Sequence, residues 1–427
     1  MAERLRGLRG NSPIRQFANE PMGDRNAPAG IEPLFIFLFF FNTFFQPQGI
    51  TVSLLLTPVW LYLLQRDNRI HLLPYLFVPM LAFAAIHIYG GADLFYYAVS
   101  ATMLFCICIC CMAAWPYLND PALDYDHLFR RILRINFVFA LISLPLLFLP
   151  VLKPAVWYIM SMSEGIRIIP RLKLFTYEAS HYSYMLAPLA IYFYGKAMLL
   201  RPERMLPILC MITLPLLLSL SFGVLSCLLF SGLIFLLVYG KAIFDTKQRR
   251  ITLLLVLGAL ALALFVLFYF FPENILLVRF QNMLVGKDTS ARGRTYESFI
   301  LAQKIIVEKS YLWGIGPGQL KIAGRNIIVQ YYYYSKIPET IRIPNACAET
   351  IVCFGYVGFA LRIGIQLLLF YTSKVFRSPY RLWLFLFLFI FQFTGSYITN
   401  VTEYVFWIMA FSPALSFFGR EARVRHR

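Results

Sequence analysis

Residues 205–240 read MLPILCMITLPLLLSLSFGVLSCLLFSGLIFLLVYG, without a single Asp, Glu, Lys or Arg. A helix that crosses the hydrocarbon of a bilayer needs about 20 residues, so this stretch is too long for one span. Ser219, Ser221 and Gly223 interrupt the apolar run near its middle. We therefore predict two consecutive membrane helices here, with a break at these small residues.

The rest of the chain has the same character. The whole chain is 59% hydrophobic and only 14% charged, with a mean hydropathy of +0.67. A soluble domain could not hide so much apolar surface. Apolar segments recur near 33–46, 50–65, 71–89, 93–115, 134–152, 180–196, 205–220, 222–240, 251–271, 346–371, 381–397 and 401–418. We predict an all-α, polytopic integral membrane protein with about twelve transmembrane helices.

The Lys and Arg residues between these segments predict the orientation. Every short inner segment is basic if the N-terminus is cytoplasmic. These segments are the arm 1–32, Arg66/Arg69, Arg130/Arg131/Arg134, Lys196/Arg201/Arg204, Lys241/Lys247/Arg249/Arg250, Lys374/Arg377/Arg381 and the tail 419–427. The short outer loops at 47–49, 90–92 and 398–400 contain no Lys or Arg. The positive-inside rule then predicts that both termini are cytoplasmic. The polar arm also lacks the features of a cleavable signal, so we expect the first apolar run to be an uncleaved anchor.

Two outer segments carry most of the remaining positive charge. They are 153–180, with Lys153, Arg167, Arg171 and Lys173, and 272–345, with Arg279, Lys287, Arg292, Arg294, Lys304, Lys309, Lys321, Arg325, Lys336 and Arg342. Long loops translocate largely regardless of charge, which is one explanation. The other is an electropositive cavity for a pyrophosphate or another acidic group. The net charge of +18 forms no basic stripe on a soluble module, so we expect no nucleic-acid partner.

The segment 272–345 is expected to be a large helical loop between the spans of 33–271 and those of 346–418. Ser298–Glu308 has apolar residues at helical spacing, which predicts an amphipathic helix at the membrane surface. Asp288 begins a plausible capping region before it. Gln319–Gln330 is expected to form another short helix.

Two motifs in this loop have more than one explanation. Gly314, Gly316 and Gly318 could cradle a phosphate with backbone N–H groups, or could form a tight turn. The run Tyr331–Tyr334 is typical of interfacial anchoring and also suits stacking on sugar rings.

The eight cysteines follow no metal or disulfide spacing. Cys106, Cys108, Cys110 and Cys111 lie inside an apolar run, where thiols act as small packing residues. The outer loops contain no obvious divalent-metal motif. We expect no cofactor and no metal.

Three motifs in order resemble the O-antigen ligase/polymerase superfamily of bacterial inner-membrane enzymes. They read ARGRTYESF at 291–299, YLWGIGPGQL at 311–320 and PNACAETIVCFGYVG at 344–358. The segment from Arg171 to His181 is similar to the family's arginine-then-acidic lead into its mid-chain helix. The resemblance covers most of the chain. It implies a GT-C-like membrane fold, a periplasmic active site, an undecaprenyl-pyrophosphate-linked glycan donor, a glycan acceptor and a chain-length regulator as a partner.

The resemblance and the chemistry together select candidate residues. Glycosyl transfer needs stabilisation of a leaving pyrophosphate and a base for the acceptor hydroxyl. The arginine fork binds phosphate oxygens bidentately. The leading pyrophosphate ligands are Arg171, Arg292 and Arg294, supported by Arg167, Arg279, Arg342, Asn345, Gly316 and Gly318. The candidate catalytic residues are Glu349, Glu178 and His181. Glu349 could instead form an ion pair, and His181 a structural hydrogen bond.

One departure separates the possible activities. Ligases of this family typically carry a His-Asn pair where this chain has Pro344-Asn345. The missing histidine favours a Wzy-type polysaccharide polymerase over a ligase that moves glycan to lipid A-core or protein. A lipid-linked oligosaccharide transporter is a third hypothesis, and Arg362 is the main charge within a predicted span.

Overall fold

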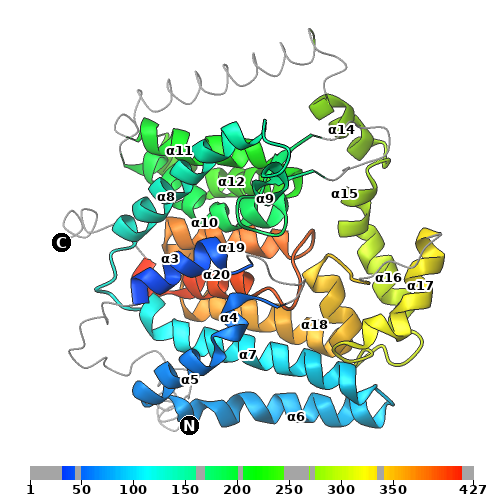
Figure 1. Cartoon of the computed structure of the whole chain (residues 1–427). Coiled ribbons are helices and arrows are strands. Elements are labelled where there is room, and N and C mark those ends of the chain that lie inside the picture. Colours follow the sequence, from blue (N-terminus) through cyan, green and yellow to red (C-terminus); the bar gives the residue numbers. More distant parts are fainter. Residues whose placement is uncertain are drawn as a thin grey trace.

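The structure is a computed structural model that describes residues 31–43, 50–159, 169–200, 205–244, 269, 275–333 and 341–415. It is mostly helical (Figure 1). The helices of more than four residues are α3 (Ile31–Phe41), α5 (Thr57–Arg66), α6 (Leu73–Tyr89), α7 (Leu94–Leu118), α8 (Tyr125–Leu146), α10 (Ala179–Leu199), α11 (Leu206–Ser219), α12 (Phe222–Ile243), α14 (Ile275–Leu284), α15 (Thr289–Arg294), α16 (Tyr296–Ile306), α17 (Ala323–Tyr332), α18 (Ala346–Thr372), α19 (Pro379–Phe391) and α20 (Val401–Phe411). The shorter elements are α4 (Val52–Leu55), α9 (Lys153–Val156), the strands β1 (Trp157–Tyr158) and β2 (Arg171–Leu172), and the 3-10 turns η1 (Ile70–Leu72), η2 (Gln319–Lys321), η3 (Val375–Arg377) and η4 (Pro413–Leu415).

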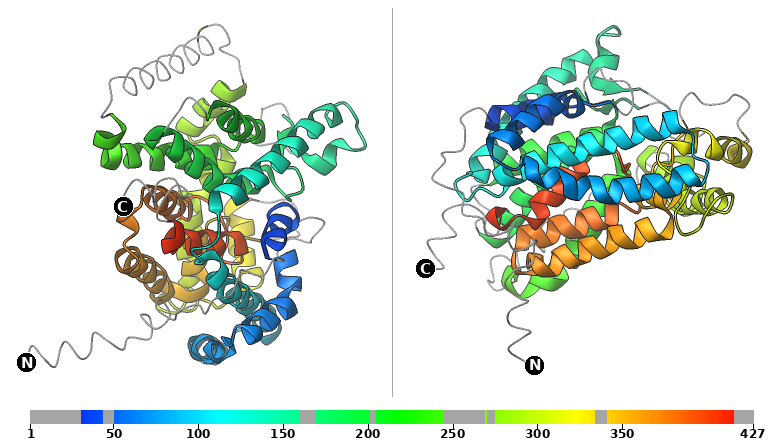
Figure 2. Two further views of the ribbon diagram at one scale, coloured as in Figure 1. Left: turned by 90° about the vertical axis from the view of Figure 1, so that its left-hand side faces the viewer. Right: turned by 90° about the horizontal axis from the view of Figure 1, so that it is seen from below.

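The long helices run side by side and share two ends (Figures 1 and 2). Helices α14 to α17 gather at one of them, on the right of Figure 1, where α6 turns into α7 and where α18 begins. We call this the loop end. Arg294 of the second charged segment forms an ion pair with Glu178 of the first, so the two segments meet at this end of the bundle.

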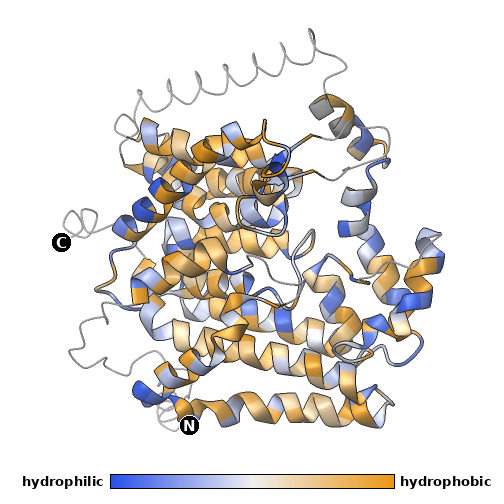
Figure 3. Ribbon diagram, viewed as in Figure 1, coloured by the Kyte–Doolittle hydropathy of each residue, from blue (hydrophilic) through white to orange (hydrophobic). Residues whose placement is uncertain are grey.

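Four described helices are long and apolar enough to cross a membrane: Ile70–Tyr89, Leu94–Leu118, Phe222–Lys241 and Ala346–Thr372. Apolar residues also dominate the shorter helices α3, α11, α19 and α20 (Figure 3). Helix α6 buries only His87 and exposes large apolar side chains such as Tyr75, Val78 and Leu81. A row of this kind is costly in water but suits lipid. The structure thus agrees with an all-α, multi-pass membrane protein.

The predicted break in 205–240 is confirmed. Helix α11 ends at Ser219, and α12 begins at Phe222. Ser219 Oγ donates to the carbonyl of Leu216 at 2.6 Å, and Leu220 has φ +46°. These features end one helix and let the chain turn into the next.

Other boundaries differ from the prediction. The predicted segment 134–152 overlaps α8, which ends at Leu146 and begins early, at Tyr125, because Asp124 caps it by accepting from His127 N at 3.1 Å. Arg130 and its basic neighbours therefore lie within a helix and not in a loop. The segment 50–65 is divided into α4 and α5, and the last two spans are shorter than expected. The predicted span 251–271 lies outside the described residues apart from Tyr269.

A two-stranded antiparallel sheet is one feature that the all-α prediction misses. Strand β1 pairs with β2, so that Tyr158 lies opposite Arg171 and Trp157 opposite Leu172. The pair closes the first charged segment into a hairpin and fixes the backbone of Arg171.

The helices expected in the second charged loop are present. Helix α16 covers most of the predicted Ser298–Glu308. Asp288 is an N-cap as expected, accepting from Ala291 N at 2.9 Å, but it caps the separate short helix α15. The stretch from Gln319 onward forms η2 followed by α17 instead of one helix.

Helix α18 is kinked at Gly355, and the glycine turn of the loop fills the kink. Gly355 has φ +64°, and an added Cβ would lie 2.2 Å from the carbonyl oxygen of Leu312. Tyr356 N and Val357 N donate to the carbonyls of Tyr311 and Leu312, at 3.0 and 3.1 Å. In return, Ile315 N and Gly316 N donate to the carbonyls of Val352 and Cys353, at 2.9 and 3.0 Å. The loop thus satisfies the backbone groups that the kink leaves without helical partners.

Candidate functional site

The loop end contains a cavity of about 280 Å³ that brings together residues from both charged segments. Arg171 reaches it from β2, Glu178 from the residue before α10, and Arg294 from the last position of α15. Tyr158 of β1 and the α11–α12 turn form other parts of its wall. Three residues that the sequence analysis selected are therefore neighbours in space.

Glu178 and Arg294 form an ion pair across this cavity. Arg294 Nη2 donates to Glu178 Oε1 at 2.7 Å, although the two residues are 116 positions apart in the chain. Glu178 has an extended backbone, and its side chain does not cap α10. Burial raises the pKa of Glu178, but the charge of Arg294, hydrogen bonds from Ser180 and Arg294, and the charge of Arg171 together lower it below its ordinary value. Glu178 is therefore a carboxylate at neutral pH.

Arg171 supplies a second cation to the cavity. It is 7% exposed, and its guanidinium carbon lies 4.8 Å from the centroid of the Tyr158 ring. The strand pairing holds the ring opposite the arginine. A guanidinium that rests on an aromatic face can donate hydrogen bonds from its planar edge.

Hydroxyl groups make up much of the remaining polar wall. They belong to Ser180, Ser221, Ser226, Ser290, Thr295 and Thr394. A hydroxyl both donates and accepts hydrogen bonds, so such a wall suits phosphate oxygens and sugar hydroxyls. The sequence analysis did not select these residues. For Ser221 and Ser226 the available signal was the serine-rich break in the apolar stretch 205–240.

A second, smaller cavity of about 20 Å³ lies behind the ion pair. Glu178, Ser180, Arg294 and Phe391 line both cavities, so they form a shared wall. The other residues around the small cavity are Tyr177, His181, Tyr184, Pro344, Ser396, Tyr397 and Asn400. Its volume is enough for about one water molecule or one hydroxyl group.

Two buried polar atoms belong to side chains that line the small cavity. His181 is 7% exposed and Tyr184 is 1% exposed. His181 Nε2 and the hydroxyl of Tyr184 have no hydrogen-bond partner among the described residues. Buried polar atoms normally have partners, so these two atoms suit a ligand or a water molecule in the cavity.

Asn345 holds the backbone around the site. It is fully buried and caps α18 by accepting from Ala348 N at 2.9 Å. Its amide nitrogen donates to the carbonyls of Arg294 at 2.9 Å and Phe393 at 2.6 Å. Asn345 therefore fixes the end of α15 against the segment after α19, and its own side chain is fully engaged.

Glu349 and Arg342 contact the segment between α19 and α20. Glu349 Oε2 accepts from Ile398 N at 2.8 Å, and the described residues place no basic side chain within ion-pair distance of it. The guanidinium of Arg342 lies 5.5 Å from the centroid of the Tyr397 ring. Both residues support the segment that carries Ser396 and Tyr397, and neither lines the two cavities.

The remaining candidates lie elsewhere. Arg292 Nε donates to Glu297 Oε1 at 2.7 Å, and its Nη1 donates to the Gly286 carbonyl at 3.1 Å, so its side chain is held away from the cavity. Gly316 donates its N–H to α18. An added Cβ at Gly318 would lie 2.2 Å from the carbonyl oxygen of Tyr96. The glycine run therefore has the geometry of a docked turn. Arg167 and the side chain of Arg279 lie outside the described residues.

A polar network inside the membrane-spanning region includes Arg362, which the sequence singled out. Arg362 forms a buried ion pair with Glu403, and its Nε donates to Gln392 Oε1 at 2.9 Å. Gln392 in turn exchanges two hydrogen bonds of 2.9 Å with Gln366. The network joins α18 to α20 and to the end of α19.

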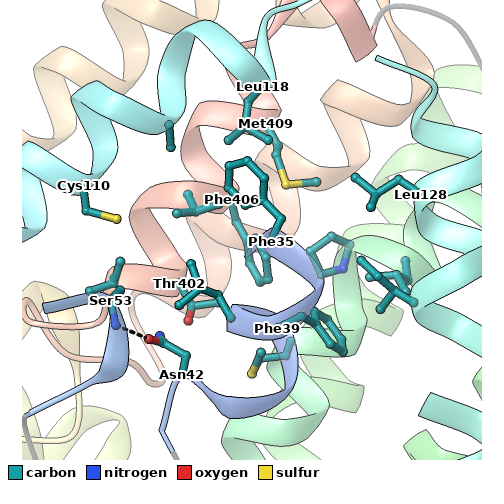
Figure 4. A pocket seen from close by; sticks show the side chains of 18 of the residues that line it. Phe35, Phe39, Asn42, Ser53, Cys110, Leu118, Leu128, Thr402, Phe406 and Met409 are labelled. Atoms are coloured by element: carbon teal, nitrogen blue, oxygen red, sulfur yellow. Dashed lines mark hydrogen bonds between the residues drawn. The ribbon is translucent and has the colours of Figure 1, made fainter. Parts of the chain in front are cut away.

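The third cavity has a different character. It has a volume of about 110 Å³ and lies between α3, α7, α8, α10 and α20 (Figure 4). Its wall is mostly apolar, with Phe35, Phe39 and Phe406 among the lining residues. Asn42 is one of its few polar groups, and its Oδ1 accepts from Ser53 N at 2.9 Å. This cavity offers space for hydrocarbon but no charged group for chemistry.

The described residues contain no group of three or more His, Cys, Asp or Glu side chains that could hold a metal ion. No protein-family model and no curated protein matches the chain. The function must therefore be inferred from the site.

Proposed function

We propose that the chain is a glycosyltransferase that uses a polyprenyl-pyrophosphate-linked glycan, and specifically a bacterial surface-polysaccharide polymerase. In this proposal about twelve helices span the inner membrane, both termini are cytoplasmic and the loop end faces the periplasm. Donor and acceptor are both undecaprenyl-pyrophosphate-linked glycans, and the product is a longer chain on one lipid carrier.

The observation that carries the proposal is the 280 Å³ cavity with Arg171 and Arg294 on its wall. Transfer from a lipid pyrophosphate breaks the bond between the anomeric carbon and a phosphate oxygen. Negative charge develops on that oxygen, and guanidinium groups that line the cavity stabilise it. The hydroxyl-lined wall suits the adjoining sugar.

The acceptor hydroxyl needs a group to take its proton. Glu178 and His181 line the small cavity. Glu349 acts through the backbone of Ile398 and is better suited to positioning the segment that carries Tyr397. The three candidate residues thus divide into two that can reach a substrate and one that supports the wall.

Pro344 favours a polymerase over a ligase. It stands where ligases of the resembled family carry a histidine, and it lines the small cavity. A proline side chain can neither donate nor accept a proton. Any base in this cavity must therefore come from another element.

A transporter is the second candidate, because Arg362 and Glu403 form a buried ion pair inside the membrane-spanning region. Charges at that depth often mark a transport path. Here Arg362 is bound by both Glu403 and Gln392 within a hydrogen-bonded network. Neither Arg362 nor Glu403 lines any of the three cavities. This arrangement favours a structural role.

The test is in vitro transfer. The purified full chain in lipid nanodiscs is mixed with undecaprenyl-pyrophosphate-linked repeat units isolated from cells that lack this gene. We expect ladders of longer lipid-linked glycans. Movement of intact units across vesicles without chain growth would support the transporter, and growth only when lipid A-core is added would support the ligase.

A further inference from the structure

The shared wall between the two cavities suggests how the site is divided. We propose that the Glu178–Arg294 ion pair is a partition that the donor pyrophosphate opens, and that the small cavity behind it receives the acceptor hydroxyl beside His181. This inference rests on the proposed function and adds a second subsite to it.

The large cavity has two guanidinium groups on its wall, but Arg294 is already paired with Glu178 at 2.7 Å. A pyrophosphate carries more negative charge than one carboxylate and presents several oxygens, so it competes with Glu178 for the guanidinium of Arg294. Donor binding therefore draws Arg294 toward the large cavity.

The small cavity lies behind the Glu178–Arg294 ion pair. The main-chain carbonyl of Arg294 is held by Asn345, so the side chain and not the backbone is expected to move. Because Glu178 and Arg294 line both cavities, their separation connects the two spaces. The donor thus opens the path by which an acceptor hydroxyl reaches its anomeric carbon.

The acceptor hydroxyl must lose its proton when it bonds to the donor sugar. Of the side chains around the small cavity, His181 and Tyr184 have buried polar atoms without a partner in the described part of the chain. A histidine nitrogen can accept a proton, whereas a tyrosine hydroxyl mainly donates or accepts a hydrogen bond at neutral pH. We assign His181 as the base and Tyr184 as a group that orients the acceptor oxygen.

The reaction then balances as follows. The acceptor O–H bond breaks, and its proton passes to His181 Nε2. The acceptor oxygen forms a bond to the anomeric carbon of the donor. The bond between that carbon and the pyrophosphate oxygen breaks, and its electron pair leaves with the pyrophosphate, which Arg171 and Arg294 stabilise.

The partition is tested by measuring how the full chain binds undecaprenyl pyrophosphate. Glu178→Gln removes the competing charge, so we expect several-fold tighter binding. Glu308→Gln is the matched control, because it makes the same charge change at an exposed position of the second charged segment. Unchanged or weaker binding by Glu178→Gln would overturn the partition. If Glu178 only positioned Arg294 for the donor, its removal would weaken binding.

The acceptor subsite is tested by transfer kinetics with isolated repeat units. His181→Gln should lower kcat by about 100-fold or more while the affinity for undecaprenyl pyrophosphate stays unchanged. His127→Gln, at an exposed histidine far from the site, should match the wild type.

Tyr184→Phe provides a variant that keeps the fold, because it removes a buried hydroxyl that has no partner among the residues the structure describes. It should raise the KM for the acceptor. Normal transfer by both His181→Gln and Tyr184→Phe would refute the acceptor subsite. Failure of the wild type to bind undecaprenyl pyrophosphate or to extend glycans would instead refute the proposed function.

Discussion

A carboxylate and two basic side chains lie next to each end of helix α10, but the two groups have different surroundings. At the loop end, Glu178 forms an ion pair with Arg294, and both line a cavity. At the opposite end, about 27 Å away along the helix, Asp126 accepts from Lys196 at 2.6 Å and from Arg130 at 2.7 Å.

The difference lies in what else surrounds each carboxylate. Asp126 also accepts from Tyr192 at 3.2 Å, and none of the residues in its group lines the three cavities. The group at Asp126 is saturated and holds α8 against α10. The group at Glu178 borders empty space. Similar charges thus hold two helices together at one end and line a cavity at the other.

The largest expected effect is a difference in transfer activity between variants at the two ends of α10. Arg294→Ala should lower glycan transfer by about 100- to 1,000-fold, the usual cost of removing one donor to a developing charge. Arg130→Ala is the matched control at the opposite end and should retain activity within a few fold per folded molecule. The measurement is chain extension by purified protein. Equal losses in both variants would show that the two ends do not differ in function.

A smaller effect is expected on stability, for a variant at the Asp126 end of α10. Lys196→Met leaves Asp126 without its closest partner, so we expect a loss of about 1–3 kcal/mol in the free energy of unfolding. Transfer activity per folded molecule should not change. Thermal unfolding in detergent measures the effect, with Lys241→Met at an exposed position as the control. A loss of activity without a loss of stability would contradict a purely structural role for this end.

The smallest effect concerns pH. The pKa of Glu178 in the folded protein lies below its ordinary value of 4.5. The stability that its ionised form contributes is therefore fully present above about pH 4.5 and is lost as the pH falls through the lower, folded-state pKa.

The Tm difference between the wild type and Glu178→Gln should consequently shrink as the pH is lowered from about 6 to 3. Glu308→Gln should show no such trend. A constant Tm difference for Glu178→Gln would mean that the ion pair is not the cause.

Much of the fold could be read from the sequence because apolar length and small-residue breaks are local signals. The division at Ser219 and Phe222 and the helix at Tyr296–Ile306 follow from such signals. The extension of α8 to Tyr125 was missed, since a cap at Asp124 outweighs the basic residues that resemble a loop.

The site was only partly predictable. The sequence places Arg292 and Arg294 in one motif, but residues two apart on a helix point in widely different directions. The structure pairs Arg292 with Glu297 and directs Arg294 into the cavity. Neither the β1–β2 hairpin that presents Arg171 nor the hydroxyl-lined wall can be deduced from spacing, because both depend on segments distant in the chain.

The kink in α18 has a consequence for how the protein is made. Residues 311–316 supply hydrogen-bond partners for backbone groups on both sides of Gly355. Without them, these groups would remain unpaired in a low-dielectric setting, at several kcal/mol each. The partner segment precedes α18 in the chain and leaves the ribosome first. With the proposed periplasmic loop end, biogenesis should therefore be ordered: the loop is exported and folds before the tenth predicted span can settle, and a delay in its export would stall the insertion of that span.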